Sequence, residues 1–431
     1  MKKNLVRAVL VASLSLFFAG AAFTATPAVA ADTKDAAKPK ISKALGKPLS
    51  EAQKAFGAKD WATMIAKMKE AQALPDLTDY DKYIVNYYSG LAYYNGGDAA
   101  SATPYFVAAA ESAAAPSDDH ASALRIAIDL ENQAKDYAKV KELGQLGASA
   151  GALNSAAAAE VAIAYYDTND YANANIFAQK SIDADLTAGK IPDRAAYQVL
   201  LMIQNRQKDI PGETKTLETM ATNYGDTEDW GNLIDVSLGS LPASSKGNRE
   251  IVALFLYRLR LTVGADTSVD DYLLMADLAL GLHFPGDAQK ALQVGLAKGT
   301  LSQAKAAAAV NKTDAAARTD QAALAAADAV AAKSPSSTGD VSVAEDYYGY
   351  GKYADTVRVA QRAIAKGGVK AAEAQLLLGI AQAQLGDNAA ATQSVALVKG
   401  DPALERASHL WTIYTTRKSV QAVAAPAPAG K

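Results

Sequence analysis

The segment that most directly suggests catalysis is Gly147-Ala148-Ser149-Ala150-Gly151, which matches the Gly-x-Ser-x-Gly pattern of a nucleophilic serine. That chemistry needs a strand-to-helix elbow that exposes the serine, with a catalytic acid and a histidine later in the chain. Here a predicted helix precedes the segment, and small residues fill it. We therefore interpret it as a turn between two structural units.

Other candidate chemistry is sparse. The three histidines, His120, His283 and His409, are far apart, and none is paired at i+3 or i+4, whereas a metal site needs clustered ligands. The acidic runs 167–170 and 226–229 lack the residue order of a calcium loop, so we interpret them as turn and helix-cap residues. No glycine-rich phosphate-binding motif occurs. The sequence thus predicts no enzyme, no catalytic residue, no cofactor and no metal.

The charge pattern argues against nucleic acid as a partner. The 431 residues carry a formal net charge of −3, with Lys and Arg dispersed along the chain. Arg249, Arg258 and Arg260 form the one local basic cluster, which we interpret as a solvated helix edge. The chain has no cysteine, which excludes disulfides, cysteine-based metal sites and a lipid anchor on cysteine.

The first thirty residues have the pattern of a bacterial Sec signal peptide. Lys2, Lys3 and Arg7 form a positive region, residues 8–23 are apolar, and Ala28-Val29-Ala30 is a small-x-small cleavage site. We expect cleavage after Ala30, which takes the formal charge from −3 to −6. No later apolar run is long enough for a transmembrane helix. The predicted location is the periplasm, with release from the cell as the alternative.

Composition and periodicity predict an all-α fold. Alanine dominates the apolar residues, β-branched runs are scarce, and no stretch alternates with a period of two for long. Residues 340–403 hold two copies of one helix–turn–helix unit, with Tyr353 and Asn388 in the same place 35 positions apart. Earlier units align on turns that are 38, 38, 34 and 39 residues apart, at Trp61, Ala99, Tyr137, Tyr171 and Ile210. About eight such units indicate stacked helix pairs with a shared core.

These units resemble the tetratricopeptide repeat (TPR), and the chain is identified as an exported bacterial member of that superfamily. The signature of small and aromatic residues is matched by Gly90, Tyr93, Gly97, Ala102, Phe106 and Ala109, by Ala162, Tyr165, Tyr171, Ala174, Ala178 and Ser181, and by Gly379, Gly386, Ala391 and Pro402. The resemblance implies a right-handed superhelical solenoid of antiparallel helix pairs.

We expect the following organisation: signal peptide 1–30, flexible lead-in 31–48, TPR-like array 49–300, Ala-rich helical insertion or linker 301–339, C-terminal TPR pair with a capping helix 340–418, and disordered tail 419–431. The array departs from the repeat pattern at a longer loop near Pro242. The insertion consists of one or two exposed helices or of a poorly packed segment, because alanine buries little apolar area.

In the TPR family the first helix of each unit lines a concave groove, and the resemblance carries this role to matching positions here. The implied partner-binding residues are Tyr87, Tyr94, Asn95, Arg125, Asn132, Tyr166, Asn205, Arg206 and Tyr348. The twenty tyrosines outnumber Phe and Trp together, and amphipathic aromatics with polar neighbours are typical of peptide-binding surfaces. The family's Lys and Asn clamp for a chain-terminal carboxylate is not reproduced.

The leading hypothesis is therefore a periplasmic scaffold or adaptor that binds a partner protein or peptide on its concave face. The alternative is a helical solenoid that binds a glycan or peptidoglycan strand and assists an enzyme of the cell envelope. The sequence leaves open the partner, the pathway, the oligomeric state, and whether residues 301–333 pack into the array.

Overall fold

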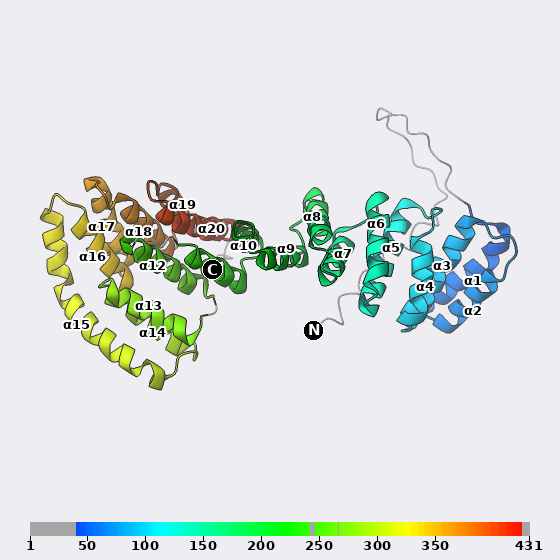
Figure 1. Cartoon of the computed structure of the whole chain (residues 1–431), viewed down its shortest axis with the longest axis horizontal. Helices are drawn as coiled ribbons and strands as arrows, with labels where there is room; N and C mark the ends of the chain where they lie inside the picture. The colour runs from blue at the N-terminus through cyan, green and yellow to red at the C-terminus, as the bar shows by residue number, and fades with distance from the viewer. Residues whose placement is uncertain (1–39, 242–245, 266, 425–431) are drawn as a thin grey trace, which may run out of the picture.

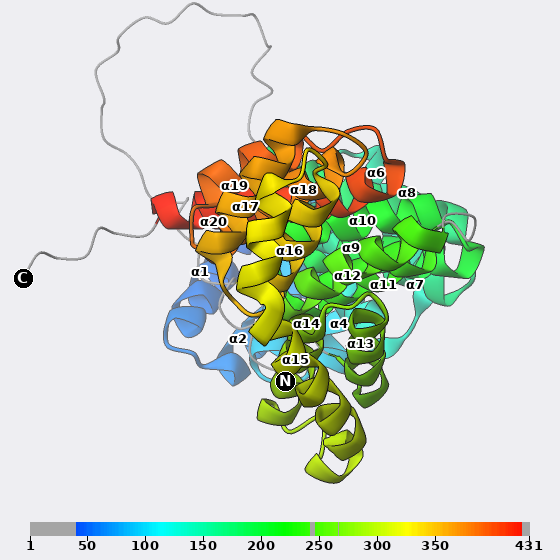
Figure 2. The same cartoon turned by 90° about the vertical axis from the view of Figure 1, so that its left-hand side faces the viewer.

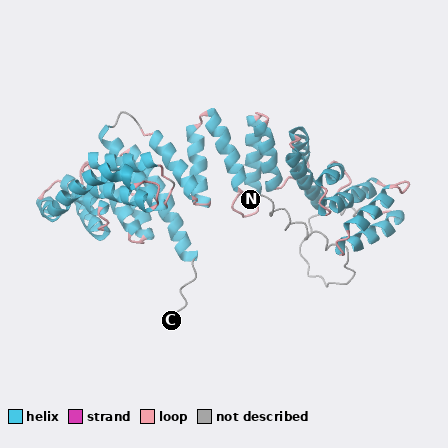
Figure 3. Cartoon of the chain, turned by 90° about the horizontal axis from the view of Figure 1, so that it is seen from below, coloured by secondary structure: helices cyan, strands magenta, loops and turns pink. Residues whose placement is uncertain are grey.

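The computed structural model describes residues 40–241, 246–265 and 267–424, and these residues form α-helices with no β-strand among them (Figure 3). The expected signal peptide lies outside this range. The helices are α1 (Lys43–Gly57), α2 (Trp61–Gln72), α3 (Asp79–Asn95), α4 (Ala99–Ala110), α5 (Ser117–Ala134), α6 (Tyr137–Ser149), α7 (Ser155–Asp167), α8 (Tyr171–Thr187), α9 (Arg194–Gln207), α10 (Ile210–Asn223), α11 (Thr227–Gly239), α12 (Lys246–Val263), α13 (Val269–Gly281), α14 (Pro285–Ala297), α15 (Gln303–Lys333), α16 (Thr338–Gly349), α17 (Tyr353–Lys366), α18 (Ala371–Gln384), α19 (Asn388–Ala396) and α20 (Pro402–Ala424). Helix α1 begins at Lys43, inside the segment expected to be a flexible lead-in, because Leu45 is fully buried against the next helices.

One turn recurs between the two helices of each N-terminal hairpin. A residue with positive φ ends the first helix, and the aspartate that follows caps the second helix by accepting a hydrogen bond from a backbone N–H of its first turn. The five pairs are Lys59-Asp60, Gly97-Asp98, Lys135-Asp136, Asn169-Asp170 and Lys208-Asp209. This recurring turn explains why the repeat units align on their turns in the sequence.

Small residues let the two helices of a hairpin approach closely. A Cβ atom placed on Gly90 of α3 would lie 3.0 Å from the Phe106 ring of α4. A Cβ atom on Gly379 of α18 would lie 2.5 Å from a Val395 methyl group of α19. Phe106 and Val395 are fully buried at these contacts. The signature positions Gly90, Phe106 and Gly379 therefore have the packing role that the repeat pattern implies.

The helices form two lobes that meet at α9 and α10 (Figure 1). One apolar cluster runs from Leu45 to Met220, and a second runs from Leu217 to Trp411. Leu201 of α9 packs against both clusters. The N-terminal lobe is an open row of hairpins, in which α7 contacts both α5 and α9 directly. The narrow join is therefore built from one hairpin.

The Ala-rich segment forms a single helix, α15, that packs along the C-terminal lobe between α14 and α16 (Figure 2). Only one narrow edge of it is buried, at Ala306, Thr313, Ala317, Leu324 and Ala331. Two aspartates add polar contacts: Tyr350 donates to Asp320 at 2.7 Å and Tyr347 donates to Asp328 at 3.1 Å. The alanines thus allow a long helix to lie close to its neighbours.

Helix α20 does more than cap the last hairpin, which was its expected role. It also folds back on α10 and α12, far earlier in the chain. Trp411 is fully buried, and its indole Nε1 donates to the Phe255 carbonyl of α12 at 3.1 Å. Arg417 donates to the Thr222 carbonyl at the end of α10, at 2.8 Å. The C-terminal lobe is consequently a closed body rather than an open stack.

Inside this closed body, Arg258 of α12 joins two further helices. Its guanidinium donates to both carboxylate oxygens of Asp287 (α14) at 2.9 and 2.6 Å, and it lies 2.5 Å from Glu345 (α16). Arg258 is 3% exposed and Arg260, which pairs with Asp235 at 2.9 Å, is 4% exposed. The interpretation of this pair as a solvated helix edge was wrong, because both cations are buried against carboxylates from other helices.

Carboxylates outnumber cations around Arg258. Burial raises the pKa of Glu345, against the opposing effect of Arg258. Burial also raises the pKa of the neighbouring Asp346 to about 8, and the carboxylates of Asp320, Glu345 and Asp287 add to that shift. One carboxylate oxygen of Asp346 is buried without a hydrogen-bond partner. Asp346 therefore holds a proton near neutral pH.

We predict that Trp411→Ala lowers the free energy of unfolding of the C-terminal lobe by about 3–5 kcal/mol, because it leaves a large cavity and removes the indole hydrogen bond to the Phe255 carbonyl. Urea denaturation followed by circular dichroism measures the effect. Trp61→Ala, at a partly buried tryptophan of the N-terminal lobe, serves as the control. An unchanged C-terminal transition in Trp411→Ala would contradict the closing role of α20.

We predict that the stability of the C-terminal lobe falls as pH rises from about 5 through about 8. The folded lobe keeps a proton on Asp346 that the unfolded chain has already lost above its ordinary pKa, so rising pH favours the unfolded state. Between these pH values, Asp346 should account for a loss of unfolding free energy on the order of a few kcal/mol. Asp346→Asn should abolish that part of the pH dependence. Urea midpoints across this pH range test it, with Asp355→Asn on the surface as the matched control. The same slope in Asp346→Asn as in the wild type would refute the assignment.

Candidate functional site

The first helices of successive hairpins in the N-terminal lobe include α3, α5, α7 and α9 (Figure 1). Helix α7 contacts both α5 and α9, whereas α3 and α5 are joined through α4. We call the side that carries the predicted binding residues of these helices the inner face. On α5, Arg125 and Asp129 are one helical turn apart and so project from the same side. Neither is fully buried. The inner face thus has a polar surface supplied by several hairpins.

Four side chains from three helices gather at its centre: Tyr94 of α3, Arg125 and Asp129 of α5, and Glu160 of α7. Burial raises the pKa of Tyr94, Asp129 raises it further, and Arg125 opposes the shift. Burial likewise raises the pKa of Glu160 to about 8, with Asp129 adding to the shift and Arg125 opposing it. One Glu160 oxygen is buried without a hydrogen-bond partner in the described part of the chain. The cluster therefore offers one cation, two carboxyl groups and a phenol.

Sequence reasoning missed Glu160. Its signal was available, because Glu160 directly follows the alanine run 156–159 and is the one charged residue before Asp167 on this predicted first helix. Small neighbours leave a long side chain uncovered by bulky groups, yet here the Glu160 side chain is partly buried, near Arg125 and Asp129 of α5. That burial depends on the angle between hairpins, which the sequence does not reveal.

A second group of predicted residues lines a hollow of about 560 Å³ where the two lobes meet. Tyr166 of α7 and Asn205 and Arg206 of α9 line it together with Met202, which is 40% exposed. The opposite wall is supplied by α10 and α11, including Asp235. The hollow therefore combines an aromatic ring, an exposed thioether, an amide and charges of both signs.

Aromatic stacking helps to order this second hollow. The Arg206 guanidinium lies 5.6 Å from the centre of the Tyr171 ring, and the Tyr166 and Tyr171 ring centres are 5.5 Å apart. A cation over an aromatic face is held without losing its hydrogen-bonding capacity at the edge. The exposed Arg206 thus contributes its guanidinium edge to the lining of the hollow.

Three further predicted binding residues contribute less to the exposed surface of the inner face. Tyr87 is partly buried among aromatic rings, with its ring centre 5.9 Å from that of Tyr83 and 6.0 Å from that of Phe106. The side-chain amide of Asn95 donates to the Leu91 carbonyl one turn earlier, at 2.8 Å. Asn132 is partly buried near the end of α5. These contacts make Tyr87 and Asn95 largely structural.

The prediction that Tyr348 binds a partner was wrong. Tyr348 is 1% exposed, and its ring lies 4.4 Å from the Arg258 guanidinium inside the C-terminal lobe. The repeat pattern places it on the first helix of its hairpin, but α12 covers that side. Burial raises the pKa of its phenol. The C-terminal lobe has no open inner face at this position.

The serine segment 147–151 and His120, which were considered as candidates for chemistry, have structural roles. Ser149 is the last residue of α6, and its hydroxyl donates to the Gln145 carbonyl at 2.9 Å, so the segment lies at a helix end and forms no strand-to-helix elbow. His120 contacts the Ala110 carbonyl at 2.6 Å. Within the described residues, no group of three or more His, Asp or Glu side chains lies together as metal ligands. None of the described helices is both long and apolar enough to cross a bilayer.

The first acidic run supplies turn and cap residues, as predicted. Asp170 caps α8 by accepting from the Asn173 backbone N–H at 3.1 Å. In the second run, Asp226 stands at the N-cap position of α11, but its side chain forms no cap hydrogen bond. There the Arg194 guanidinium donates hydrogen bonds to the carboxylates of Asp226 and Asp229, the latter at 2.6 Å. Their charges are thereby used within the fold.

No family model and no curated protein matches the sequence. Among solved structures, a tetratricopeptide repeat protein from Parabacteroides merdae is similar at 10% identity over 63% of this chain and 99% of that one, with a TM-score of 0.34. The TPR domain of P58(IPK) is similar at 12% identity over 88% and 99%, with a TM-score of 0.22. Naa15/Naa10 bound to HypK-THB is similar at 12% identity over 88% and 67%, with a TM-score of 0.28.

Contacts within the described residues define the fold. Those contacts are the antiparallel helix pairs, the repeated turn with its capping aspartate, and the small residues that face Phe106 and Val395. The described part of this chain is therefore an all-α, TPR-like array of helical hairpins.

Proposed function

We propose that this protein is an exported scaffold or adaptor, which binds an extended segment of a partner protein along its inner face in the periplasm. The observation that carries the proposal is the hollow at the join of the lobes. It brings together Tyr166, Asn205 and Arg206, three residues assigned to binding from their repeat positions alone.

The kinds of side chain support a binding role. Tyrosine and arginine dominate the energetic centres of protein interfaces, because each combines a large apolar area with a polar edge. Tyr94 and Arg125 lie upstream of the hollow on neighbouring helices, so one extended chain could contact both groups. Amide groups such as Asn205 suit the main chain of such a segment, since they can both donate and accept hydrogen bonds.

The proposed location rests on the N-terminal thirty residues. Their charge pattern, apolar stretch and Ala28-Val29-Ala30 motif are those of a cleaved export signal. A partner in the cell envelope follows from that location. Binding to a glycan strand instead of a protein is the alternative, and the experiment below separates the two.

We predict that Tyr166→Ala combined with Arg206→Ala weakens capture of the partner at least about tenfold, because two central contacts of an interface typically contribute more than 1 kcal/mol each. Cross-linking and pull-down from envelope extract, followed by mass spectrometry and glycan analysis, measures the captured material. Circular dichroism checks that helicity is unchanged.

Tyr105→Ala combined with Arg318→Ala is the matched control. Tyr105 lies on α4 and the exposed Arg318 lies on α15, so both are outside the inner face. Capture should be as strong as in the wild type. Equal capture by both double variants, or recovery of glycan with no protein, would overturn the adaptor proposal.

We predict that the protein isolated from the periplasmic fraction begins at Ala31. Intact-mass measurement and N-terminal sequencing test this directly. Ala28→Arg combined with Ala30→Arg should leave the uncleaved precursor, because the signal peptidase site accepts small residues. A mature protein that retains Met1, or one recovered only from the cytoplasm, would contradict export by this signal.

A further inference from the structure

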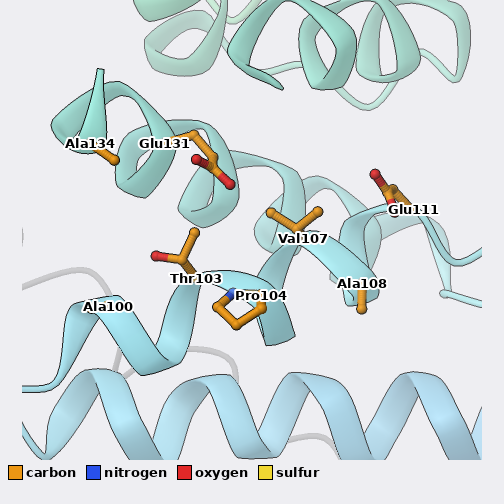
Figure 4. A pocket seen from close by; sticks show the side chains of 8 residues that line it. All are labelled: Ala100, Thr103, Pro104, Val107, Ala108, Glu111, Glu131 and Ala134. Atoms are coloured by element: carbon orange, nitrogen blue, oxygen red, sulfur yellow. The ribbon is translucent and has the colours of Figure 1, made fainter. Parts of the chain in front are cut away.

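A groove that the inner face does not use runs along α4 of the N-terminal lobe. Its first part is a hollow of about 530 Å³ between α4 and α5 (Figure 4). Pro104 and Val107 form its apolar floor, while Glu131 and Ala134 project from α5 above them. On a helix with 3.6 residues per turn, Ala134 lies about 180° and Glu131 about 120° around the α5 axis from Arg125. This hollow is therefore separate from the proposed binding face.

The second part of the groove is a hollow of about 560 Å³ between α4 and α3, where Asp79 and Asn86 contribute. Ala108 and Glu111 line both hollows. The two hollows thus form one continuous surface, which we call the α4 groove. It crosses from α3 over α4 to α5.

The α4 groove combines an apolar floor with excess negative charge. Its lining contains Asp79, Glu111 and Glu131 but one cation, Lys82, which pairs with Asp79 at 3.0 Å. The nearby Lys139 lies 3.1 Å from Glu111 and 2.7 Å from Glu142, so its charge is divided.

Glu131 is the least compensated of these carboxylates. Burial raises its pKa, Asp136 raises it further, and Lys139 opposes the shift. Its carboxylate forms no hydrogen bond or ion pair with another described residue. A partly desolvated carboxylate of this kind gains most from a cation that arrives with a ligand.

We propose that the α4 groove is a second docking surface, and that it binds a cationic amphipathic segment of a partner protein. Apolar side chains of the segment rest on Pro104 and Val107, and a Lys or Arg side chain lies between Glu131 and Glu111. Charge complementarity selects this occupant over an acidic or purely apolar one. This proposal does not depend on the inner face. Refuting binding at one surface therefore leaves the proposal for the other surface intact.

The test uses two synthetic amphipathic peptides, one of leucine and lysine and one of leucine and glutamate in the same pattern, with binding measured by fluorescence anisotropy. The lysine peptide should bind the full-length protein, and the glutamate peptide should not. Glu131→Lys should weaken binding of the lysine peptide by about fivefold. Glu131→Gln should weaken it less, in the same direction. Raising the salt concentration should also weaken binding.

Two further variants separate docking from general charge attraction. Asp277→Lys makes the same charge change at a 70% exposed site on α13 and should leave binding unchanged. Val107→Asp adds negative charge yet removes part of the apolar floor, so it should weaken binding; circular dichroism checks its folding. Equal weakening by Asp277→Lys and Glu131→Lys, loss of peptide binding in the double variant of Tyr166 and Arg206, or no binding by the wild type would overturn the proposal.

Discussion

A single hairpin of this chain cannot bury its own apolar side, and that constraint determines the rest of the structure. Each pair of helices gains its core only by stacking on a neighbour, so every element is tied to the next along the chain. In the N-terminal lobe the stacking stays open, and α3, α5, α7 and α9 leave one side uncovered. In the C-terminal lobe α20 returns to α10 and α12, and the stack closes. The same local rule thus gives one lobe with a free surface and one without.

Local features of the fold were predictable because they depend on nearby residues. The turn before each second helix needs a residue that tolerates positive φ and an oxygen that caps the helix, and pairs such as Gly97-Asp98 supply both within two positions. The small residue at Gly90 and the ring at Phe106 fix the approach of α3 and α4. The handedness of the superhelix stays a prediction from the family resemblance.

Features that join distant segments were not predictable from the same patterns. Tyr348 and Arg258 each follow a local pattern that suggests exposure, but each is buried by the other, from helices far apart in the chain. The predicted binding residues show the same difference between local and distant contacts. Tyr166 and Arg206 come from adjacent hairpins, and the repeat register alone brings them together. Glu160 was missed because its partial burial depends on the angle between hairpins.

The return of α20 has a consequence for the order in which the protein acquires its structure. Hairpins of the N-terminal lobe contact only near neighbours, so they can assemble one after another as the chain emerges from a ribosome or a translocation channel. The C-terminal lobe cannot do so, because Trp411 must reach Phe255, which lies more than 150 residues earlier. Its apolar surfaces on α10 and α12 therefore stay open until α20 has been delivered. That interval is the period in which this protein most needs protection from aggregation, and its length is determined by the position of one helix.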